Sequence, residues 1–146
     1  MDRQTLLERT YLFRGATNDD LASLAEIAAP RKYLQGDLLF NGGDEADAMF
    51  VVEVGTVDIV PTGKELAVAT IGSGQTFGEM AFFSRGNRPA SARAREMSDI
   101  LRIPFDRLER LLGERPALAV TLYRNACGFL AKHVRTLLSD LDRRYF

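Results

Sequence analysis

Apolar residues at helical spacing mark the first zone of the chain, residues 1–30. From Leu21 to Ala28 they recur every three or four positions, as in a helix that buries one face. The polar run Thr17–Asp20 comes just before them and offers the short side chains that cap a helix N-terminus. We therefore predict short helices in this zone, which Pro30 ends.

The pattern changes over residues 31–104, where short apolar runs of β-branched and aromatic residues are separated by glycines. These runs are Leu38–Phe40, Met49–Val54, Val57–Val60, Ala67–Ile71 and Ile100–Ile103. Several short strands with turn residues between them are typical of an antiparallel sandwich or jelly roll. The glycines most simply provide turn geometry, so we assign them structural roles.

Helical spacing returns over residues 105–144. A short amphipathic segment ends near Gly113, and Pro116 suits the first turn of a longer helix. Apolar residues of this helix alternate spacings of four and three, as in a coiled-coil seam. We call this set the α-helical seam; its members are Tyr123, Cys127, Leu130, Val134, Leu137 and Leu141. The seam predicts either a homodimer through this helix or a helix packed on its own domain.

Length and composition suit one globular domain. The chain has 146 residues, 46% of them hydrophobic and 27% charged, which is enough for a single core. We expect an α+β fold: a helical lead-in over 1–30, an antiparallel β-roll (a double-stranded jelly roll) over 31–104, and C-terminal helices over 105–144.

Charge and reactive residues exclude several classes of function. The net charge of −1 gives no basic surplus for nucleic-acid binding. Cys127 and His133 are the only residues of their types, so a Cys/His metal site and a Cys–His catalytic set are poorly supported. No apolar run is long enough for a membrane helix, and no signal peptide is recognisable. We therefore expect a cytoplasmic protein that needs no metal or cofactor.

The stretch Phe77–Ala94, FGEMAFFSRGNRPASARA, carries the candidate chemistry. Gly78 lets the backbone approach a ligand closely, and a short helix opening after Glu79 would direct free N–H groups at an anion. Glu79 can accept a bond from a hydroxyl but would repel a phosphate. Arg88, nine residues further on, offers a charged fork of donors suited to phosphate oxygens. The spacing thus separates an acid for a sugar from an arginine for a phosphate.

This stretch resembles the phosphate-binding cassette of the cyclic nucleotide-binding domain family, which includes the catabolite activator protein and the regulatory subunit of protein kinase A. The segments Leu12–Ala28 and Gln35–Ile59 also resemble the lead-in and first strands of that family. The resemblance implies that Arg88 holds the phosphate and Glu79 the ribose 2′-hydroxyl. The full set of implied binding residues is Phe77, Gly78, Glu79, Met80, Ala81, Arg88, Pro89, Ala90 and Ser91.

Pro89 departs from the family pattern. A small residue that keeps its N–H usually follows the cassette arginine, whereas proline has no N–H to offer a phosphate. Members that prefer cyclic GMP often carry threonine or serine there, so Pro89 favours cyclic AMP over cyclic GMP. The same departure supports an alternative, a degenerate domain of this fold that binds no ligand and serves interaction or dimerisation.

The leading hypothesis is an allosteric sensor module, regulator-like, whose cyclic nucleotide occupancy shifts the C-terminal helices. An enzyme, such as a phosphodiesterase or a cupin-like metalloenzyme, is disfavoured because one histidine cannot build a histidine-rich metal cluster. Activator-type members continue after the long helix into a DNA-binding domain, but this sequence ends at Phe146. No nucleic-acid contact is therefore expected from this chain, and no membrane contact either.

Overall fold

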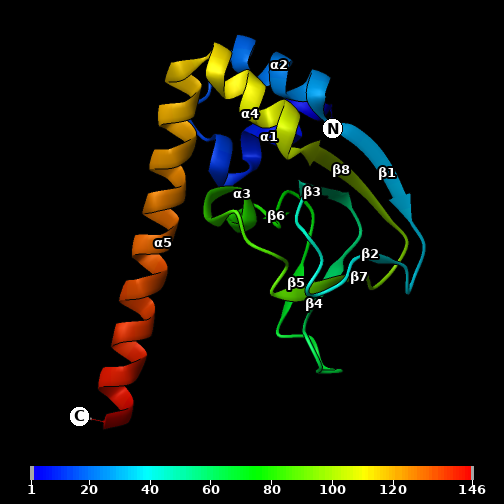
Figure 1. Ribbon diagram of the computed structural model, residues 1–146, viewed down its shortest axis with the longest axis vertical. Coiled ribbons are helices and arrows are strands. Elements are labelled where there is room, and N and C mark those ends of the chain that lie inside the picture. The colour runs from blue at the N-terminus through cyan, green and yellow to red at the C-terminus, as the bar shows by residue number, and fades with distance from the viewer. Residues whose placement is uncertain (1, 146) are drawn as a thin grey trace.

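The computed structural model describes the backbone of residues 2–145 and the side chains of residues 2–143. Short helices cover one end of a β-roll, and a long C-terminal helix runs down beside the roll (Figure 1). The lead-in contains α1 (Arg3–Arg9), the 3-10 helix η1 (Tyr11–Phe13) and α2 (Asn18–Ile27). Thr17 and Asp20 form a reciprocal capping box at the start of α2, so the predicted capping run is confirmed.

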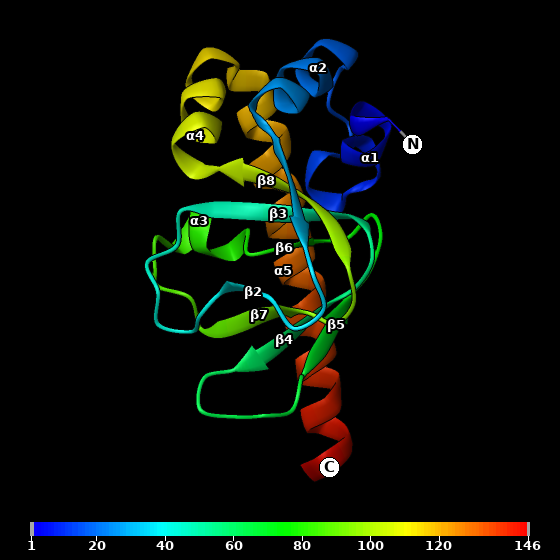
Figure 2. The ribbon, with the colours of Figure 1, turned by 90° about the vertical axis from the view of Figure 1, so that its right-hand side faces the viewer.

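Two four-stranded antiparallel sheets make up the roll (Figure 2). One has the order β1-β8-β3-β6 and the other β2-β7-β4-β5. The strands are β1 (Ala29–Tyr33), β2 (Leu38–Phe40), β3 (Ala48–Val54), β4 (Val57–Pro61), β5 (Ala69–Ile71), β6 (Thr76–Phe77), β7 (Ala90–Ala94) and β8 (Ser98–Pro104). These sheets with flanking helices confirm the predicted fold class.

Pro30 follows helix α2 but lies inside a strand that has already begun, whereas its sequence context suggested that it closes the helical zone. It belongs to β1, opposite Leu101 of β8. Strand β1 is at the edge of its sheet, where a residue without an N–H costs no ladder hydrogen bond. The β-structure consequently begins at Ala29, and α2 ends two residues before it.

Alternate residues of β3 supply two separate cores, because side chains of a strand point to opposite faces. Met49 and Val51 face the helices and join a cluster with Leu101 and Ile103 of β8. Phe50 faces the interior of the roll. The strand is thus buried on both faces, and it links the helical end of the molecule to the inside of the roll.

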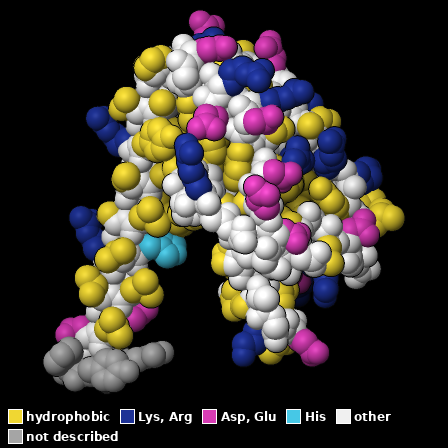
Figure 3. Space-filling view, in the orientation of Figure 1, with side chains coloured by type: hydrophobic (Ala, Val, Ile, Leu, Met, Phe, Trp, Pro, Cys, Tyr) yellow, Lys and Arg dark blue, Asp and Glu magenta, His cyan; other side chains and the backbone are white. Residues whose placement is uncertain are grey.

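After β8 the chain forms α4 (Phe105–Glu114) and α5 (Pro116–Tyr145). Among the described residues, the first half of α5 contacts the rest of the molecule: Leu118 and Leu122 are buried, and Asn125 Nδ2 donates to the carbonyls of Leu12 and Arg14 at 2.9 and 2.8 Å. Further along, the seam is exposed, with Leu137 60% accessible. A hollow separates this half of α5 from the roll, and apolar side chains line the helix (Figure 3). From Leu130 onward the seam is thus exposed, whereas its first member, Tyr123, lies edge-to-face against Phe83 of α3 (Met80–Ser84) with ring centres 5.5 Å apart.

Across residues 2–145, no helix combines the length and apolarity that crossing a membrane requires.

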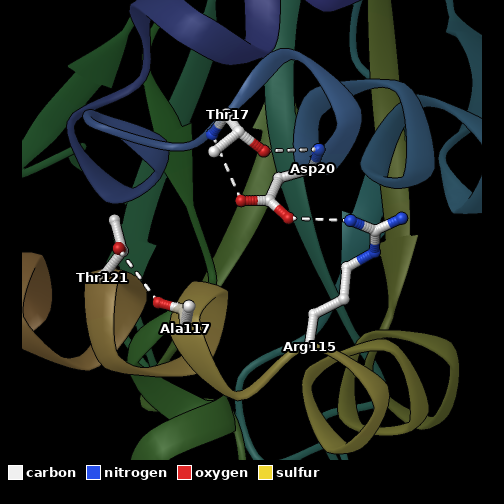
Figure 4. Close-up of polar contacts among 5 residues, drawn as sticks. All are labelled: Thr17, Asp20, Arg115, Ala117 and Thr121. Atoms are coloured by element: carbon white, nitrogen blue, oxygen red, sulfur yellow. Dashed lines mark hydrogen bonds and ion pairs between the residues drawn. The ribbon is translucent and has the colours of Figure 1, made fainter.

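An ion pair joins the lead-in to the C-terminal helices (Figure 4). Asp20 Oδ2 accepts from the Thr17 N–H at 3.2 Å, and its Oδ1 accepts from Arg115 Nη1 at 3.0 Å. Burial acts to raise the pKa of Asp20, but the bonds from Thr17 and Arg115 outweigh it and hold that pKa below its usual range. The charged carboxylate thus stabilises the contact between α2 and the start of α5.

We expect Asp20→Asn to lower the free energy of unfolding at pH 7 by about 1–3 kcal/mol. A lowered pKa in the folded state gives stability that is present above the unfolded pKa of about 3.9 and lost as pH falls through the folded pKa. The difference between parent and variant, measured by urea unfolding, should therefore shrink between about pH 5 and pH 3. Asp19→Asn, at an exposed position of the same turn, is the control. A difference that is constant with pH would contradict this role.

Candidate functional site

Arg88 lies in the loop between α3 (Met80–Ser84) and β7, and its side chain turns into the roll. Only 4% of the residue is accessible. Nη1 donates to the Gly78 carbonyl at 3.1 Å, and Nη2 donates to the Ala48 carbonyl. The guanidinium carbon lies 4.1 Å from the centre of the Phe40 ring, a cation–π distance. Backbone carbonyls and an aromatic face therefore hold this arginine in place.

The charge of Arg88 has no paired anion among the residues that the structure describes. Within the described residues, no carboxylate oxygen lies within 4.0 Å of its guanidinium nitrogens. Burial lowers the pKa of Arg88 from its ordinary value, and the carboxylates of Asp47 and Asp44 partly oppose this shift. Because arginine titrates so far above neutrality, it stays charged. A buried cation with only carbonyl partners is poorly compensated, and an anion beside it would be stabilised.

A cavity of about 400 Å³ opens beside Arg88, within the size range of small-molecule sites. Its lining residues are Tyr33, Leu39, Phe40, Asp44, Glu45, Asp47, Phe50, Arg88 and Arg102. A larger hollow of about 770 Å³ lies between α3, α4 and α5, but Arg88 does not line it. The smaller cavity is therefore the candidate site, since it contains the unpaired charge.

Gly78 provides the turn that leads from β6 into α3. Its φ of +79° is one that residues with a side chain rarely adopt. A Cβ there would also lie 2.8 Å from Arg88 Nη1. Glycine is thus required twice, for its backbone conformation and for the close approach of the arginine.

Glu79 is the residue just before α3, and it is 8% accessible. Its Oε2 is buried and has no hydrogen-bond partner among the described residues. Burial raises the pKa of this carboxyl above its usual range. The side chain does not cap α3.

The structure brings some of the other predicted residues to the site and leaves others outside it. Phe77 is buried in the roll and stacks on Phe50 with ring centres 5.2 Å apart. Met80 and Ala81 begin α3, and Ala90 is half-buried in β7. These residues belong to the cassette, but the hydrogen bonds of the Arg88 guanidinium go to other groups, the carbonyls of Gly78 and Ala48.

Ser91 and Pro89 do not join Arg88. Ser91 Oγ accepts from the Gly42 N–H at 2.8 Å, and its neighbour Ala92 is the residue buried in the interior. Pro89 is exposed, and its carbonyl accepts from the Thr62 hydroxyl at 3.2 Å. The Ser91 hydroxyl is therefore engaged on the opposite face of β7, and it does not replace the N–H that Pro89 lacks.

Sequence reasoning missed the groups that hold the arginine. The Ala48 carbonyl is a backbone group, and nothing in the sequence identifies which carbonyl a distant side chain will reach. The sequence did show an aromatic residue at Phe40, within the framework Gln35–Ile59, but no role in the site was predicted for it. The described residues contain no group of three or more His, Cys, Asp or Glu side chains placed to hold a metal ion.

Comparison with known proteins identifies the class. The model of the cyclic nucleotide-binding domain family matches residues 30–115, which is more than half of the chain. The chain belongs to this family, a family of regulatory ligand-binding domains and not of enzymes.

Among individual proteins, the cyclic AMP receptor protein of Thermus thermophilus is 31% identical over 90% of this chain and 60% of its own length. Glutaminase 1 of Bradyrhizobium diazoefficiens is 33% identical over 94% of this chain but only 22% of its own length. The N-terminal domain of a transcriptional regulator from Streptomyces coelicolor superposes with a TM-score of 0.80 at 30% identity, over 88% of this chain and 94% of that domain. The chain thus spans less than two thirds of the length of the two curated relatives, the receptor protein and the glutaminase.

Proposed function

We propose that this domain is a sensor that binds a cyclic nucleotide, with cyclic AMP preferred over cyclic GMP. The observation that carries the proposal is Arg88, a buried cation without an anionic partner beside a cavity of suitable size. A phosphodiester would replace two neutral carbonyl acceptors by anionic oxygens, so the buried cation would gain the counter-charge that it lacks among the described residues. The name of the Thermus thermophilus relative is consistent with this ligand.

The two ends of the cassette match the two polar ends of a cyclic nucleotide. Arg88 and the backbone amides at the start of α3 would hold the phosphate. Glu79, whose Oε2 has no hydrogen-bond partner in the described part of the chain, would accept a bond from the ribose 2′-hydroxyl. Occupancy would then bias the position of α5, provided that the ligand has different affinities for two arrangements of the helix.

The missing N–H of Pro89 should weaken the site without removing it. A hydrogen bond to a charged group is worth about 1.5–3 kcal/mol, so the affinity would fall by about one to two powers of ten. Pro89 has no N–H to donate, and Ser91 lies on the face of β7 opposite the interior residue Ala92, so neither side chain supplies a replacement donor inside the roll.

A second candidate, a domain that binds no nucleotide and acts only in protein association, has one observation in its favour. Phe40, Phe50 and Phe77 pack against one another in the interior of the roll, with ring centres 5.2–6.2 Å apart. The rings of Phe40 and Phe50 also line the cavity beside Arg88. A nucleotide could enter the cavity only if these rings left room for it.

Thermal unfolding in the presence of cyclic AMP, cyclic GMP and cyclic dinucleotides separates the two candidates. A ligand at a hundred times its dissociation constant stabilises the folded state by about 2.7 kcal/mol, which raises Tm by roughly 5–10 °C. The sensor predicts such a rise for cyclic AMP and a smaller one for cyclic GMP at equal concentration. An unchanged Tm with every nucleotide would favour the domain that binds no ligand.

The role of Glu79 predicts discrimination by the ribose hydroxyl. The parent protein should bind 2′-deoxy cyclic AMP about 10- to 100-fold more weakly than cyclic AMP, because a hydrogen bond to a charged group is lost. Glu79→Ala should bind both nucleotides about equally poorly. Calorimetric titration measures both ratios, and discrimination that survives in Glu79→Ala would assign the ribose contact to another residue.

A further inference from the structure

Two buried side-chain atoms of the described residues have no hydrogen-bond partner: the Tyr11 hydroxyl and Oε2 of Glu79. The hydroxyl can donate, and the ionised carboxylate can only accept. A buried polar group without a partner costs free energy comparable to a lost hydrogen bond. The two groups are therefore complementary, and each lacks what the other provides.

Tyr11 and the cassette belong to one packed region. The Tyr11 ring and two cassette residues, Phe82 and Phe83, pack against the same core cluster, and α3 lies just below the N-terminal helices in Figure 1. Burial raises the pKa of the Tyr11 hydroxyl well above its usual value, and the Glu79 carboxylate raises it further. A carboxylate has this effect on a buried hydroxyl because little water screens the interior.

Tyr11 is also in contact with the long helix. Its ring stacks on Phe129 of α5, with ring centres 4.6 Å apart and planes 20° from parallel. Phe129 in turn contacts His133 at 4.6 Å between ring centres. Asn125 bonds to two carbonyls in and next to η1. The segment that contains Tyr11 is thus a place where α5 is attached to the rest of the domain.

We propose that the Tyr11 hydroxyl and the ribose hydroxyl of the ligand compete for the Glu79 carboxylate. Without ligand, the Tyr11 hydroxyl donates to the Glu79 carboxylate after rotation of the two side chains. With ligand, the ribose hydroxyl takes the carboxylate, and Tyr11 keeps only its stack on Phe129. Tyr11 is therefore a positioning residue that links the cassette to α5. This inference rests on the proposed function.

The first test needs no ligand. Tyr11→Phe keeps the ring and its stack but removes the donor, so the pKa of Glu79, followed by carbon NMR of labelled carboxyl groups, should rise by about one unit. Tyr123→Phe, which removes a hydroxyl from the exposed face of α5, should leave it unchanged. A Glu79 pKa that is the same in parent and Tyr11→Phe would overturn the proposal.

The second test uses the competition directly. Tyr11→Phe should bind cyclic AMP about tenfold more tightly than the parent, since one hydrogen bond no longer opposes the ligand. Its affinity for 2′-deoxy cyclic AMP should not change, because that ligand does not use Glu79. Equal changes for both nucleotides, or none, would overturn the competition alone. A parent that binds neither nucleotide would overturn the proposed function as well.

The third test follows α5. His133 is the single histidine of the chain, so its imidazole gives a unique NMR signal beside Phe129. Cyclic AMP should shift this signal in the parent, whereas the shift should be much smaller in Tyr11→Phe. The same shift in both proteins would show that α5 responds without Tyr11 and would contradict its positioning role.

Discussion

Arg88→Ala is expected to weaken cyclic AMP binding by about 2–5 kcal/mol, or about 30- to 5000-fold. Among the described residues that line the cavity, Arg88 alone combines a buried position with a positive charge, since Arg102 is less buried and pairs with Asp47 at 3.0 Å. Its removal would leave the bound phosphate without a counter-charge. Isothermal titration of parent and variant measures the loss.

Two nearby arginines serve as controls. Arg85 is exposed and pairs with Glu109 at 3.1 Å, and Arg93 is exposed on β7. Alanine at either position should change the affinity much less. Arg88→Lys keeps the charge but loses the planar fork of donors, so it should lie between parent and Arg88→Ala. Unchanged affinity in a folded Arg88→Ala would place the phosphate site elsewhere.

Leu130→Glu combined with Leu137→Glu is expected to convert the protein from a dimer into a soluble monomer. We infer that the exposed seam of α5 forms a parallel two-fold interface, because its spacings of four and three keep one narrow apolar stripe on one side. Two glutamates in that interface would bury unpaired charge. Because both leucines are exposed within the single chain, the fold itself should tolerate the change.

Sedimentation at micromolar concentration measures the effect. Lys132→Glu changes the net charge by the same amount on the opposite face of α5, so this control variant should remain dimeric. Cys127, an exposed seam residue, offers a further check, since opposed cysteines of a parallel pair could form a disulfide under mild oxidation. A parent that sediments as a monomer would contradict the dimer.

The fold was predictable because its signals are local. Helical spacing, the capping run Thr17–Asp20 and the glycine-separated β runs each arise within a few residues, and each is present in the structure. The short helix after Glu79 also followed from local sequence. Pro30 was misinterpreted because its place at a sheet edge depends on β8, which is distant in sequence.

The site was less predictable, because it depends on long-range contacts. The sequence suggested Arg88 as an anion-binding residue, but the Ala48 carbonyl that holds it lies forty residues away. Whether the Ser91 side chain points into the roll depends on which face of β7 lines the interior, and that is decided by packing with distant strands. The seam was ambiguous for a related reason, since a stripe of apolar residues has the same spacing whether it meets its own domain or a second copy.

Equilibrium titration of the unmodified chain with a fluorescent cyclic AMP analogue tests the central claim most directly. The proposed sensor predicts a saturable signal that unlabelled cyclic AMP displaces and that Arg88→Ala lacks. The absence of saturable binding up to about 1 mM, where the binding free energy is only about 4 kcal/mol, would contradict the claim.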